Sequence, residues 1–330
     1  MISLEYRFDK NTIRGIHMDL SLVIPCYNEE GNVEKFFNEA EKVFAPSGLR
    51  YEYIFVNDGS TDNTAENLKA LYNSNPNKNI TVISFSRNFG KESAIFAGLQ
   101  NATGERICLI DADLQQRPET AMEMYAFLEN NADFDCVCAY QSERNESKAI
   151  SGLKSAFYSI INKMAEIEFK NGASDFRLFN SKVRDAILSL GEYHRFSKGI
   201  FSWVGFNVHY MEYKADERNS GETKWSFFKL IKYAISGIIA FSTAPLKLSI
   251  YIGSGATVFS VIYLIVTVIR KLTSHINVDG FTQLVILIAF FSGVILFTIG
   301  IIGEYIAKIY QQVKNRPIYI ASEVLKRNDK

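Results

Sequence analysis

The sequence has few of the features that mark disulfide-rich, zinc-binding or nucleic-acid-binding proteins. Its 330 residues include only 4 cysteines, which suit a reducing compartment better than a disulfide framework. These are Cys26, Cys108, Cys136 and Cys138. No Cys-x-x-Cys pair occurs, and Cys136 and Cys138 alternate along an expected strand, so we interpret them as small apolar residues rather than metal ligands. Lys and Arg number 36, as do Asp and Glu, so there is no basic excess to indicate a nucleic-acid partner.

The N-terminal region also lacks the apolar stretch of a signal peptide, so we expect the soluble part of the chain to stay in the cytosol. Long apolar runs occur only in the last third, where Leu248–Ile269 and Phe281–Ile302 carry no charge. Each run meets the roughly 20 residues needed to cross a bilayer. A pair of buried core helices is the alternative, but two charge-free runs of this length favour membrane spans.

The basic residues around these runs predict how the chain lies in the membrane. The connection Arg270–Gly280 holds two of them, Arg270 and Lys271, and both flanks hold more. The flanking residues are Lys224, Lys229, Lys232 and Lys247 before the spans and Lys308, Lys314 and Arg316 after them. The positive-inside rule then places the soluble part and both termini on the cytoplasmic side of the cell membrane. We therefore expect a multi-pass protein of the inner or plasma membrane, with two spans.

From Asp19 onward, strand-like and helix-like segments alternate. The expected strands are Leu20–Ile24, Tyr51–Asn57, Ile80–Phe85, Arg106–Ile110 and Asp133–Tyr140. The expected helices are Glu30–Phe44, Asp62–Tyr72, Lys91–Gln100 and Pro118–Asn130. Repeated strand–helix–strand units predict an α/β fold with a mainly parallel sheet covered on both faces. Ligands of such sheets bind beyond the carboxyl ends of the strands.

This organisation divides the chain into five segments. They are an N-terminal arm (1–18), a soluble domain (19–225), an amphipathic interface helix (226–245), the two spans (246–302) and a C-terminal interfacial helix with a tail (303–330). The first interface helix is predicted from apolar residues at helical spacing with lysines near one end. A helix packed on the soluble domain is its alternative. The arm is either a flexible extension or a segment before a natural start at Met18.

The first chemical signal is a pair of carboxylates after the fourth expected strand, Asp111 and Asp113. Alternation along a strand sends both to the same side, where two like charges repel unless a cation lies between them. A hard divalent ion such as Mg²⁺ or Mn²⁺ prefers oxygen ligands, and Gln115 could supply another oxygen. Asp-x-Asp alone is common on solvated loops, but its place directly after the apolar run Ile107–Ile110 favours a metal site.

Polar residues also follow the first two strands. The second strand leads into the run Asp58–Asp62, in which turn chemistry and a helix N-cap explain Asp62 but not Asp58. A carboxylate at Asp58 could accept hydrogen bonds from a base or a ribose. The first strand leads into Pro25–Glu30, which offers an aromatic ring and two acids.

These motifs recur with others in a recognisable order. The set comprises Val23–Glu29, Asp58–Ser60, Arg87–Lys91, Asp111–Asp113, Ser174–Leu178, Arg218–Trp225 and Phe241–Leu246, followed by the two spans. It resembles the family 2 inverting glycosyltransferases with a GT-A fold, and in particular the bacterial polyprenyl-phosphate glycosyltransferases, relatives of dolichyl-phosphate mannose synthase. The resemblance extends from Asp19 to about Pro317. It departs in two places: Thr223 stands where the family usually has serine, and Gln116-Arg117-Pro118 replaces a more usual acid-and-proline ending.

The resemblance implies a UDP-sugar donor and a polyprenyl phosphate acceptor, undecaprenyl phosphate in a bacterium. It implies glucose or N-acetylglucosamine as the transferred hexose. The residues implied for the nucleotide-sugar are Pro25, Tyr27, Glu29, Asp58, Lys91 and Asp111. Asp111 and Asp113, assisted by Gln115, would hold Mg²⁺ or Mn²⁺ against the diphosphate. Lys91 would neutralise phosphate charge, or else is a surface lysine at a helix start.

A phosphate acceptor determines which side chains the site needs to bind it. Its second pKa is about 6, so it is largely ionised at neutral pH and needs cations to position it more than a base to deprotonate it. The candidate cations are Arg144, Arg177, Arg218 and Lys224, each of which could instead be a surface ion-pair partner. The expected catalytic residues are Asp113, Asp175 and Arg218. Asp175 could be a general base, orient Arg177 or contact a sugar hydroxyl, and an ionised acceptor favours orientation.

Two other functions stay open. A processive polysaccharide synthase of the same fold would carry a Gln-x-x-Arg-Trp motif, absent from the sequence, and more than two spans. A non-catalytic lipid-binding or scaffold protein would have no need to crowd carboxylates. Transfer or hydrolysis of a nucleotide-sugar would separate these classes. The resemblance further implies a homo-oligomer formed through the spans.

Overall fold

The computed structural model describes residues 18–140, 173–213, 242–273 and 280–327. Its strands are β1 (Leu20–Cys26), β2 (Tyr51–Asn57), β3 (Ile80–Phe85), β4 (Arg106–Leu109), β5 (Cys136–Tyr140), β6 (Ala173–Asn180), β7 (Val208–Glu212) and β8 (Ala321–Leu325). Its helices are α1 (Val33–Phe44), α2 (Thr64–Ser74), α3 (Lys91–Asn101), α4 (Pro118–Asn130), α6 (Ser181–Ser189), α7 (Ser197–Trp203), α9 (Ala244–Thr273) and α10 (Gly280–Val313), with a 3-10 turn η1 (Ala45–Ser47).

The described strands form one sheet in the order β7-β5-β6-β4-β1-β2-β3-β8. Its centre, β4-β1-β2-β3, is parallel, as the alternation of strands and helices predicts. Three pairings are antiparallel, because β6 runs against both β4 and β5 and β8 runs against β3. The expected GT-A-like sheet is therefore confirmed, with mixed rather than parallel flanks.

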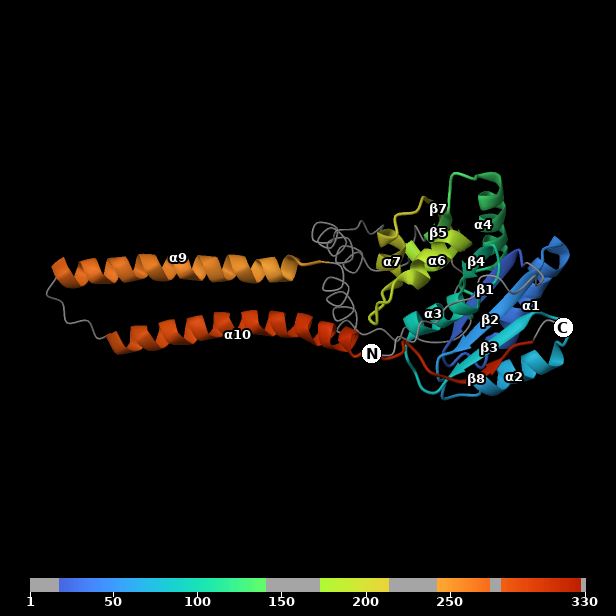
Figure 1. The fold of residues 1–330 in the computed structure, drawn as a ribbon, viewed down its shortest axis with the longest axis horizontal. Helices are drawn as coiled ribbons and strands as arrows, with labels where there is room; N and C mark the ends of the chain where they lie inside the picture. Colours follow the sequence, from blue (N-terminus) through green and yellow to red (C-terminus); the bar gives the residue numbers. More distant parts are fainter. Residues whose placement is uncertain (1–17, 141–172, 214–241, 274–279, 328–330) are drawn as a thin grey trace, which may run out of the picture.

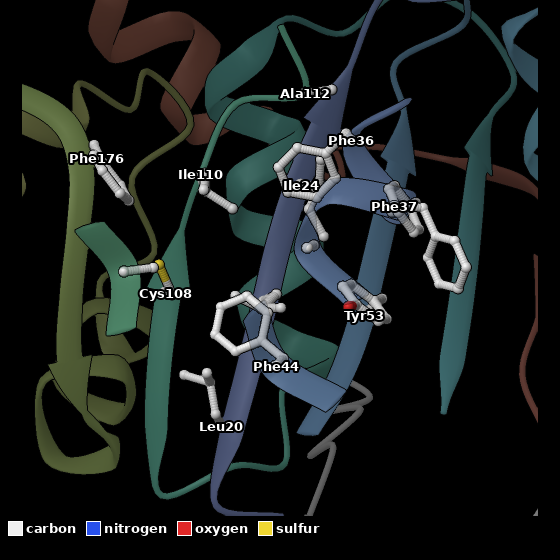
Figure 2. Packing of buried hydrophobic residues seen from close by; sticks show 14 of the residues in the cluster. Leu20, Ile24, Phe36, Phe37, Phe44, Tyr53, Cys108, Ile110, Ala112 and Phe176 are labelled. Carbon is white, nitrogen blue, oxygen red and sulfur yellow. The ribbon is translucent and has the colours of Figure 1, made fainter. Parts of the chain in front are cut away.

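Two cores cover the faces of this sheet because side chains along each strand alternate between them. Leu22 and Ile24 of β1 belong to the core under α1, α2 and α4, whereas Val23 belongs to the core under α3, α6 and α7. Figure 2 shows the first core, where Phe36 and Phe44 of α1 lie over β1 and β2. Fully burying such a ring stabilises the fold by about 2 kcal/mol. The cores thus fix the carboxyl ends of β1, β2 and β4 relative to one another.

The four cysteines lie in these cores and form no disulfide. Cys26 and Cys108 pack in the core under α1, and Cys136 and Cys138 are also buried, on β5. Burial raises the pKa of each thiol, which keeps it protonated and unreactive. The interpretation of these residues as small apolar side chains agrees with this placement.

Strand β6 was not predicted, and it brings a key residue to the edge of the sheet. It runs antiparallel to β4 with Leu109 opposite Arg177 and Arg106 opposite Asn180. Continuing this register by two residues sets Asp175 beside Asp111. Two segments that are far apart in sequence therefore meet at the carboxyl end of β4.

Helices α9 and α10 lie side by side and extend away from the sheet (Figure 1). Within them, Ala244–Ile269 and Gln283–Val313 are long and apolar enough to cross a membrane, with mean hydropathies of 2.1 and 2.8. Large apolar side chains along both are exposed, as lipid-facing residues are. Two hydrogen bonds join the helices and their flanks, from Tyr263 to Gln283 and from Tyr305 to the carbonyl of Ser242.

The helix expected after the second span is the end of α10, and the expected tail contains a strand. No proline or glycine interrupts residues 304–316, so α10 continues without a break to Val313. Beyond it, Lys314–Arg327 returns to the sheet and forms β8 along β3 (Figure 1). We call this segment the C-terminal strap. The strand was missed because Ala321–Leu325 is short and its pairing partner lies far away in sequence.

Side chains fasten the strap and the end of α10 to the sheet domain. Tyr319 stacks on Phe85 of β3 with ring centroids 4.8 Å apart. The guanidinium of Arg327 donates hydrogen bonds to carbonyls at the end of α2 and in the turn that follows it, including that of Lys78 at 2.9 Å. Gln312 of α10 donates to the carbonyl of Gly191 at 2.8 Å, in the loop after α6. The membrane-length helices are thus attached to the sheet domain at two separate places.

Candidate functional site

The turns after β1 and β2 interlock through hydrogen bonds. Asn28, in the left-handed region with φ 56°, accepts the N–H of Thr61 at 2.9 Å and donates its own N–H to Ser60 at 3.0 Å. The N–H of Glu29 donates to the hydroxyl of Thr64 at 2.8 Å. The two runs that the sequence singled out therefore form one structural unit. Together with the turn after β4 (Asp111–Gln116) and Lys91, they make up what we call the carboxyl edge.

Of the residues expected to hold a nucleoside, Tyr27 is the most accessible. Its side chain is 45% exposed beyond the end of β1, and Pro25 is partly buried in the strand. The carboxylate of Glu29 accepts a hydrogen bond from Asn32 at 2.6 Å, which holds it at the start of α1. An exposed ring fixed to a rigid turn is suited to stacking against a planar base.

Asp58 occupies a buried position and orders a neighbouring loop. Its carboxylate accepts the backbone N–H of Phe89 at 2.7 Å and that of Gly90 at 2.9 Å. Burial raises the pKa of Asp58, while these two N–H groups oppose the rise. Since Gly90 immediately precedes Lys91, the carboxylate fixes the start of α3. The structure therefore links Asp58 to Lys91, a connection that the sequence did not indicate.

Lys91 lies between two acids, Asp111 after β4 and Asp175 on β6. Its ammonium is 2.6 Å from Oδ1 and 2.8 Å from Oδ2 of Asp111, and 3.5 Å from Oδ2 of Asp175. Burial opposes the charge of Lys91, but the two carboxylates outweigh it and raise its pKa. Burial likewise opposes the charge of Asp175, but Lys91, Lys198 and Arg177 lower its pKa overall. Lys91 and Asp175 are therefore both charged at neutral pH.

The turn after β4 holds Asp111 in a fixed orientation. The side chain of Gln116 accepts the N–H of Asp111 at 2.8 Å and donates to its Oδ2 at 3.1 Å. Between them, Leu114 is left-handed with φ 60°, and the N–H of Gln115 donates to Asp113 at 3.1 Å. Sequence reasoning missed the role of Gln116, since only its burial distinguishes it from Gln115.

The oxygen atoms of this turn suit a hard divalent cation. Within the described residues, no cluster of three or more His, Cys, Asp or Glu side chains could hold a metal ion. Asp111 and Asp113 nevertheless supply two carboxylates, and Mg²⁺ is commonly bound by one or two carboxylates together with substrate phosphates. The ammonium of Lys91 on both oxygens of Asp111 shows that a cation is already favoured there. The donor set therefore fits a metal that shares its ligands with a diphosphate.

The residues expected to bind the acceptor phosphate are only partly described. Arg177 is buried on β6, where its Nε donates to the carbonyl of Ser174 at 3.2 Å and its guanidinium lies 4.5 Å from the ring centre of Phe201. Arg144, Arg218 and Lys224 lie outside the described residues, as do most of the expected interface helix and the arm (226–241 and 1–17). In this structure Arg177 therefore serves packing and lowers the pKa of Asp175.

Glu92 connects the site to α7. It accepts hydrogen bonds from both the N–H and the hydroxyl of Ser197, the N–H at 2.9 Å. Burial and the charge of Asp175 raise the pKa of Glu92. Sequence reasoning did not identify this contact, because the two residues are far apart in the chain and neither belongs to a recognised motif. It fixes α7 beside Lys91 at the start of α3.

Comparisons with known proteins cover both parts of the chain. The profile of Glycosyl transferase family 2 matches residues 21–188, and that of the GtrB C-terminal hairpin matches residues 244–309. CsbB of Bacillus subtilis (strain 168), a candidate glycosyltransferase, is 39% identical over 92% of this chain and 91% of its own. The SfII prophage-derived bactoprenol glucosyl transferase of Shigella flexneri is 38% identical over 92% of this chain and 97% of its own. The structure of glucosyl-3-phosphoglycerate synthase from Mycobacterium tuberculosis with Mn²⁺, UDP and phosphoglyceric acid aligns with a TM-score of 0.49 and 16% identity, over 67% of this chain and 76% of that one.

Proposed function

The chain belongs to glycosyl transferase family 2, and we propose that it transfers a hexose from a UDP-sugar to polyprenyl phosphate at the cytoplasmic face of a membrane. The hexose is glucose or N-acetylglucosamine, and the lipid is undecaprenyl phosphate in a bacterium. The transfer inverts the anomeric centre, so an α-linked donor gives a β-linked lipid. The enzyme is a hexosyltransferase that depends on Mg²⁺ or Mn²⁺.

One observation carries this proposal: Asp111, Lys91 and Asp175 converge at the carboxyl end of β4 in a chain with two membrane-length helices. Ligands of parallel sheets bind at that end of the strands. Charges of both signs held within 3.5 Å of one another suit a charged donor and a charged acceptor. The similarity to a bactoprenol glucosyl transferase over 92% of this chain, hairpin included, supports a lipid acceptor.

On the donor side, the nucleoside rests on Tyr27, with Pro25 and Glu29 beside it. Asp111 and Asp113 would hold the metal, with Gln115 as a further oxygen ligand. When bound, the ion offsets the negative charge that develops on the departing diphosphate. Two further residues, Asp58 after β2 and Lys91 at the end of the neighbouring loop, also contribute. Asp58 holds that loop in place, and Lys91 at its end adds a positive charge for the phosphates.

On the acceptor side, the phosphate attacks the anomeric carbon without needing a base, because it is already ionised at neutral pH. Arg218, Arg144 and Lys224 bind and orient this phosphate. Asp175 stays ionised, since its pKa is lowered, and it orients the surrounding cations rather than taking a proton. Arg177 supports it from the interior of the sheet. The catalytic residues are accordingly Asp113, Asp175 and Arg218.

The helical hairpin brings this site to its lipid. We propose that α9 and α10 span the membrane with the sheet domain and both termini in the cytoplasm. The basic residues that flank the spans support this orientation. The expected amphipathic segment 226–245 would lie in the interface near the site. A homo-oligomer through the spans is part of the same proposal.

Transfer assays on the detergent-solubilised full chain test the proposal. The protein is incubated with polyprenyl phosphate, Mg²⁺ or Mn²⁺, and a panel of UDP- and GDP-sugars. Release of nucleoside diphosphate and formation of glycolipid are followed together, and NMR of the product reports its anomeric configuration. Asp113→Ala removes a metal ligand, and Asp185→Ala removes an exposed carboxylate of α6 as the matched control.

We expect lipid-dependent release with one UDP-sugar, lost in Asp113→Ala and retained in Asp185→Ala. Release of nucleoside diphosphate without any glycolipid would indicate that the acceptor is not the lipid. An α-linked product would contradict inversion. No turnover with any donor, from protein that melts cooperatively, would favour a non-catalytic membrane scaffold.

A further inference from the structure

The ammonium of Lys91 lies where a metal held by Asp111 would have to bind. It contacts both carboxylate oxygens of Asp111, at 2.6 and 2.8 Å. Gln116 occupies part of the remaining approach to Oδ2, with its amide 3.1 Å away. Coordinated Mg²⁺ lies about 2.0–2.1 Å from its oxygens, so the ammonium and the ion cannot use the same face of this carboxylate. Two cations at such a separation also repel each other.

The side chain of Lys91 has an alternative partner within reach. Asp175 lies 3.5 Å from the ammonium, on the neighbouring strand β6. The lysine side chain is 44% exposed and sits on the first turn of α3, so its flexible stem can turn without unpacking the core. Moving from Asp111 to Asp175 keeps its charge paired. The geometry therefore offers two positions for one cation.

We propose that Lys91 is an internal counter-ion of the metal site, which leaves Asp111 when the metal arrives and then pairs with Asp175 and the diphosphate of the donor. The proposal rests on the metal part of the proposed function. It makes the metal compete with Lys91 when no nucleotide is present. With a nucleotide bound, the displaced ammonium gains phosphate oxygens as partners, so metal and donor strengthen each other's binding.

The proposal predicts that one substitution strengthens the binding of Mn²⁺ alone and weakens the binding of UDP. Lys91→Met removes the competing charge but keeps most of the side-chain length. Mn²⁺ alone should bind this variant about tenfold more tightly than wild type, since the ion no longer displaces a charge-assisted hydrogen bond. UDP in the presence of saturating Mn²⁺ should bind about tenfold more weakly, since its phosphates lose a cation.

The measurement is a titration of the full chain in detergent at low salt, with free Mn²⁺ followed by electron paramagnetic resonance and UDP binding by calorimetry. Lys42→Met is the control, because it removes an exposed lysine from an ion pair with Glu39 on α1, on the other face of the sheet. It should leave both affinities at wild-type values. Lys91→Arg retains the charge and should show no tightening of Mn²⁺. Lys91→Gln repeats the test if Lys91→Met lowers the melting temperature.

Mn²⁺ affinity that is unchanged or weaker in both Lys91→Met and Lys91→Gln would overturn the proposal. Tighter binding of both Mn²⁺ and UDP would also overturn it, because Lys91 would then have no role with the phosphates. Asp113→Ala separates this inference from the proposed function. If that variant binds Mn²⁺ as wild type does, the metal site itself is wrong. If it loses Mn²⁺ while Lys91→Met changes nothing, only the role of Lys91 is wrong.

Discussion

The carboxyl edge and the C-terminal strap both lie at the margins of the same sheet, yet they are held in different ways. At the carboxyl edge, charged side chains pair with one another, as Lys91 does with Asp111 and Asp175, and remain partly exposed. In the strap, an aromatic ring stacks on β3 and Arg327 donates to backbone carbonyls. Exposed ion pairs add little to stability, whereas a charged donor bonded to carbonyls adds more.

This difference predicts that function and stability can be separated by substitution. Changes to the charged residues of the carboxyl edge should lower activity and leave the fold intact. Changes to the strap should lower stability and leave the chemistry intact. The substitutions below test that separation, beginning with the largest expected effect.

Asp111→Asn should give the largest effect on activity. The amide keeps the shape of the side chain but loses the charge that Lys91 and the metal share. We expect turnover to fall about a thousandfold, because a bound metal stabilises the transition state by several kcal/mol. The melting temperature should change by only about 2 °C, since the lost ion pair is partly exposed. Glycolipid formation and thermal melting measure the two effects. A variant that keeps wild-type turnover would show that Asp111 is not part of the site.

Gly59→Ala should be an exception to this separation of function from stability. Gly59 belongs to the carboxyl edge, yet its substitution should lower the stability of the fold. Gly59 has φ +60°, and a Cβ atom would lie 2.3 Å from the backbone carbon of Arg87. We expect the free energy of unfolding to fall by about 3 kcal/mol through strain and the clash. Gly48→Ala is the matched control, since Gly48 also has positive φ, +75°, but has no atom within 4 Å of the added Cβ. It should cost about 1 kcal/mol from strain alone. Equal losses in the two variants, measured by denaturant unfolding, would exclude the clash as a cause.

The centre of the fold could be predicted from the sequence because its signals are local. β2, β3 and α4 have the predicted bounds, since each is a run of apolar residues between clear turn residues or a helix that begins at a proline. β6 and β8 were missed for different reasons. In β6 the apolar residues Phe176 and Leu178 alternate with the charged residues Asp175 and Arg177, but this short alternation was not recognised as a strand. β8 has no local signal, since an edge strand of five residues depends on a partner far away in the chain.

The candidate site likewise contains residues that could be predicted from the sequence and residues that could not. The sequence singled out Asp111, Asp113 and Asp58 because carboxylates at strand ends are visible as a pattern. Their partners are not visible in this way. That Asp58 faces Gly90 and that Gln116 holds Asp111 depends on how turns from separate strands fold against each other. The placement of Asp175 beside Asp111 required the register of β4 and β6, which the sequence did not provide.

Arg327→Ala tests the strap. The substitution removes donors to three carbonyls in and after the last turn of α2 and a guanidinium 4.5 Å from the ring centre of Tyr72. We expect the free energy of unfolding to fall by about 2 kcal/mol, with turnover within about twofold of wild type. Lys326→Ala, which removes the neighbouring exposed lysine, should change neither value. A large loss of turnover in Arg327→Ala at temperatures where the protein is folded would mean that the strap also positions the site.

Gln116→Leu should have the smallest effect and sharpens the comparison within the carboxyl edge. Leucine fills a similar volume but can neither accept the N–H of Asp111 nor donate to its carboxylate. Loss of a group that orients a metal ligand typically weakens metal binding about tenfold, so we expect Mn²⁺ affinity to fall by that factor. Turnover should return toward the wild-type value at saturating Mn²⁺, because Gln116 touches Asp111 rather than the substrate. Gln311→Leu, at an exposed position of α10, is the control and should leave Mn²⁺ affinity unchanged. If turnover stayed low at saturating Mn²⁺, Gln116 would have to act on the donor itself. The turn after β4 would then not divide into charged residues that react and neutral residues that position them.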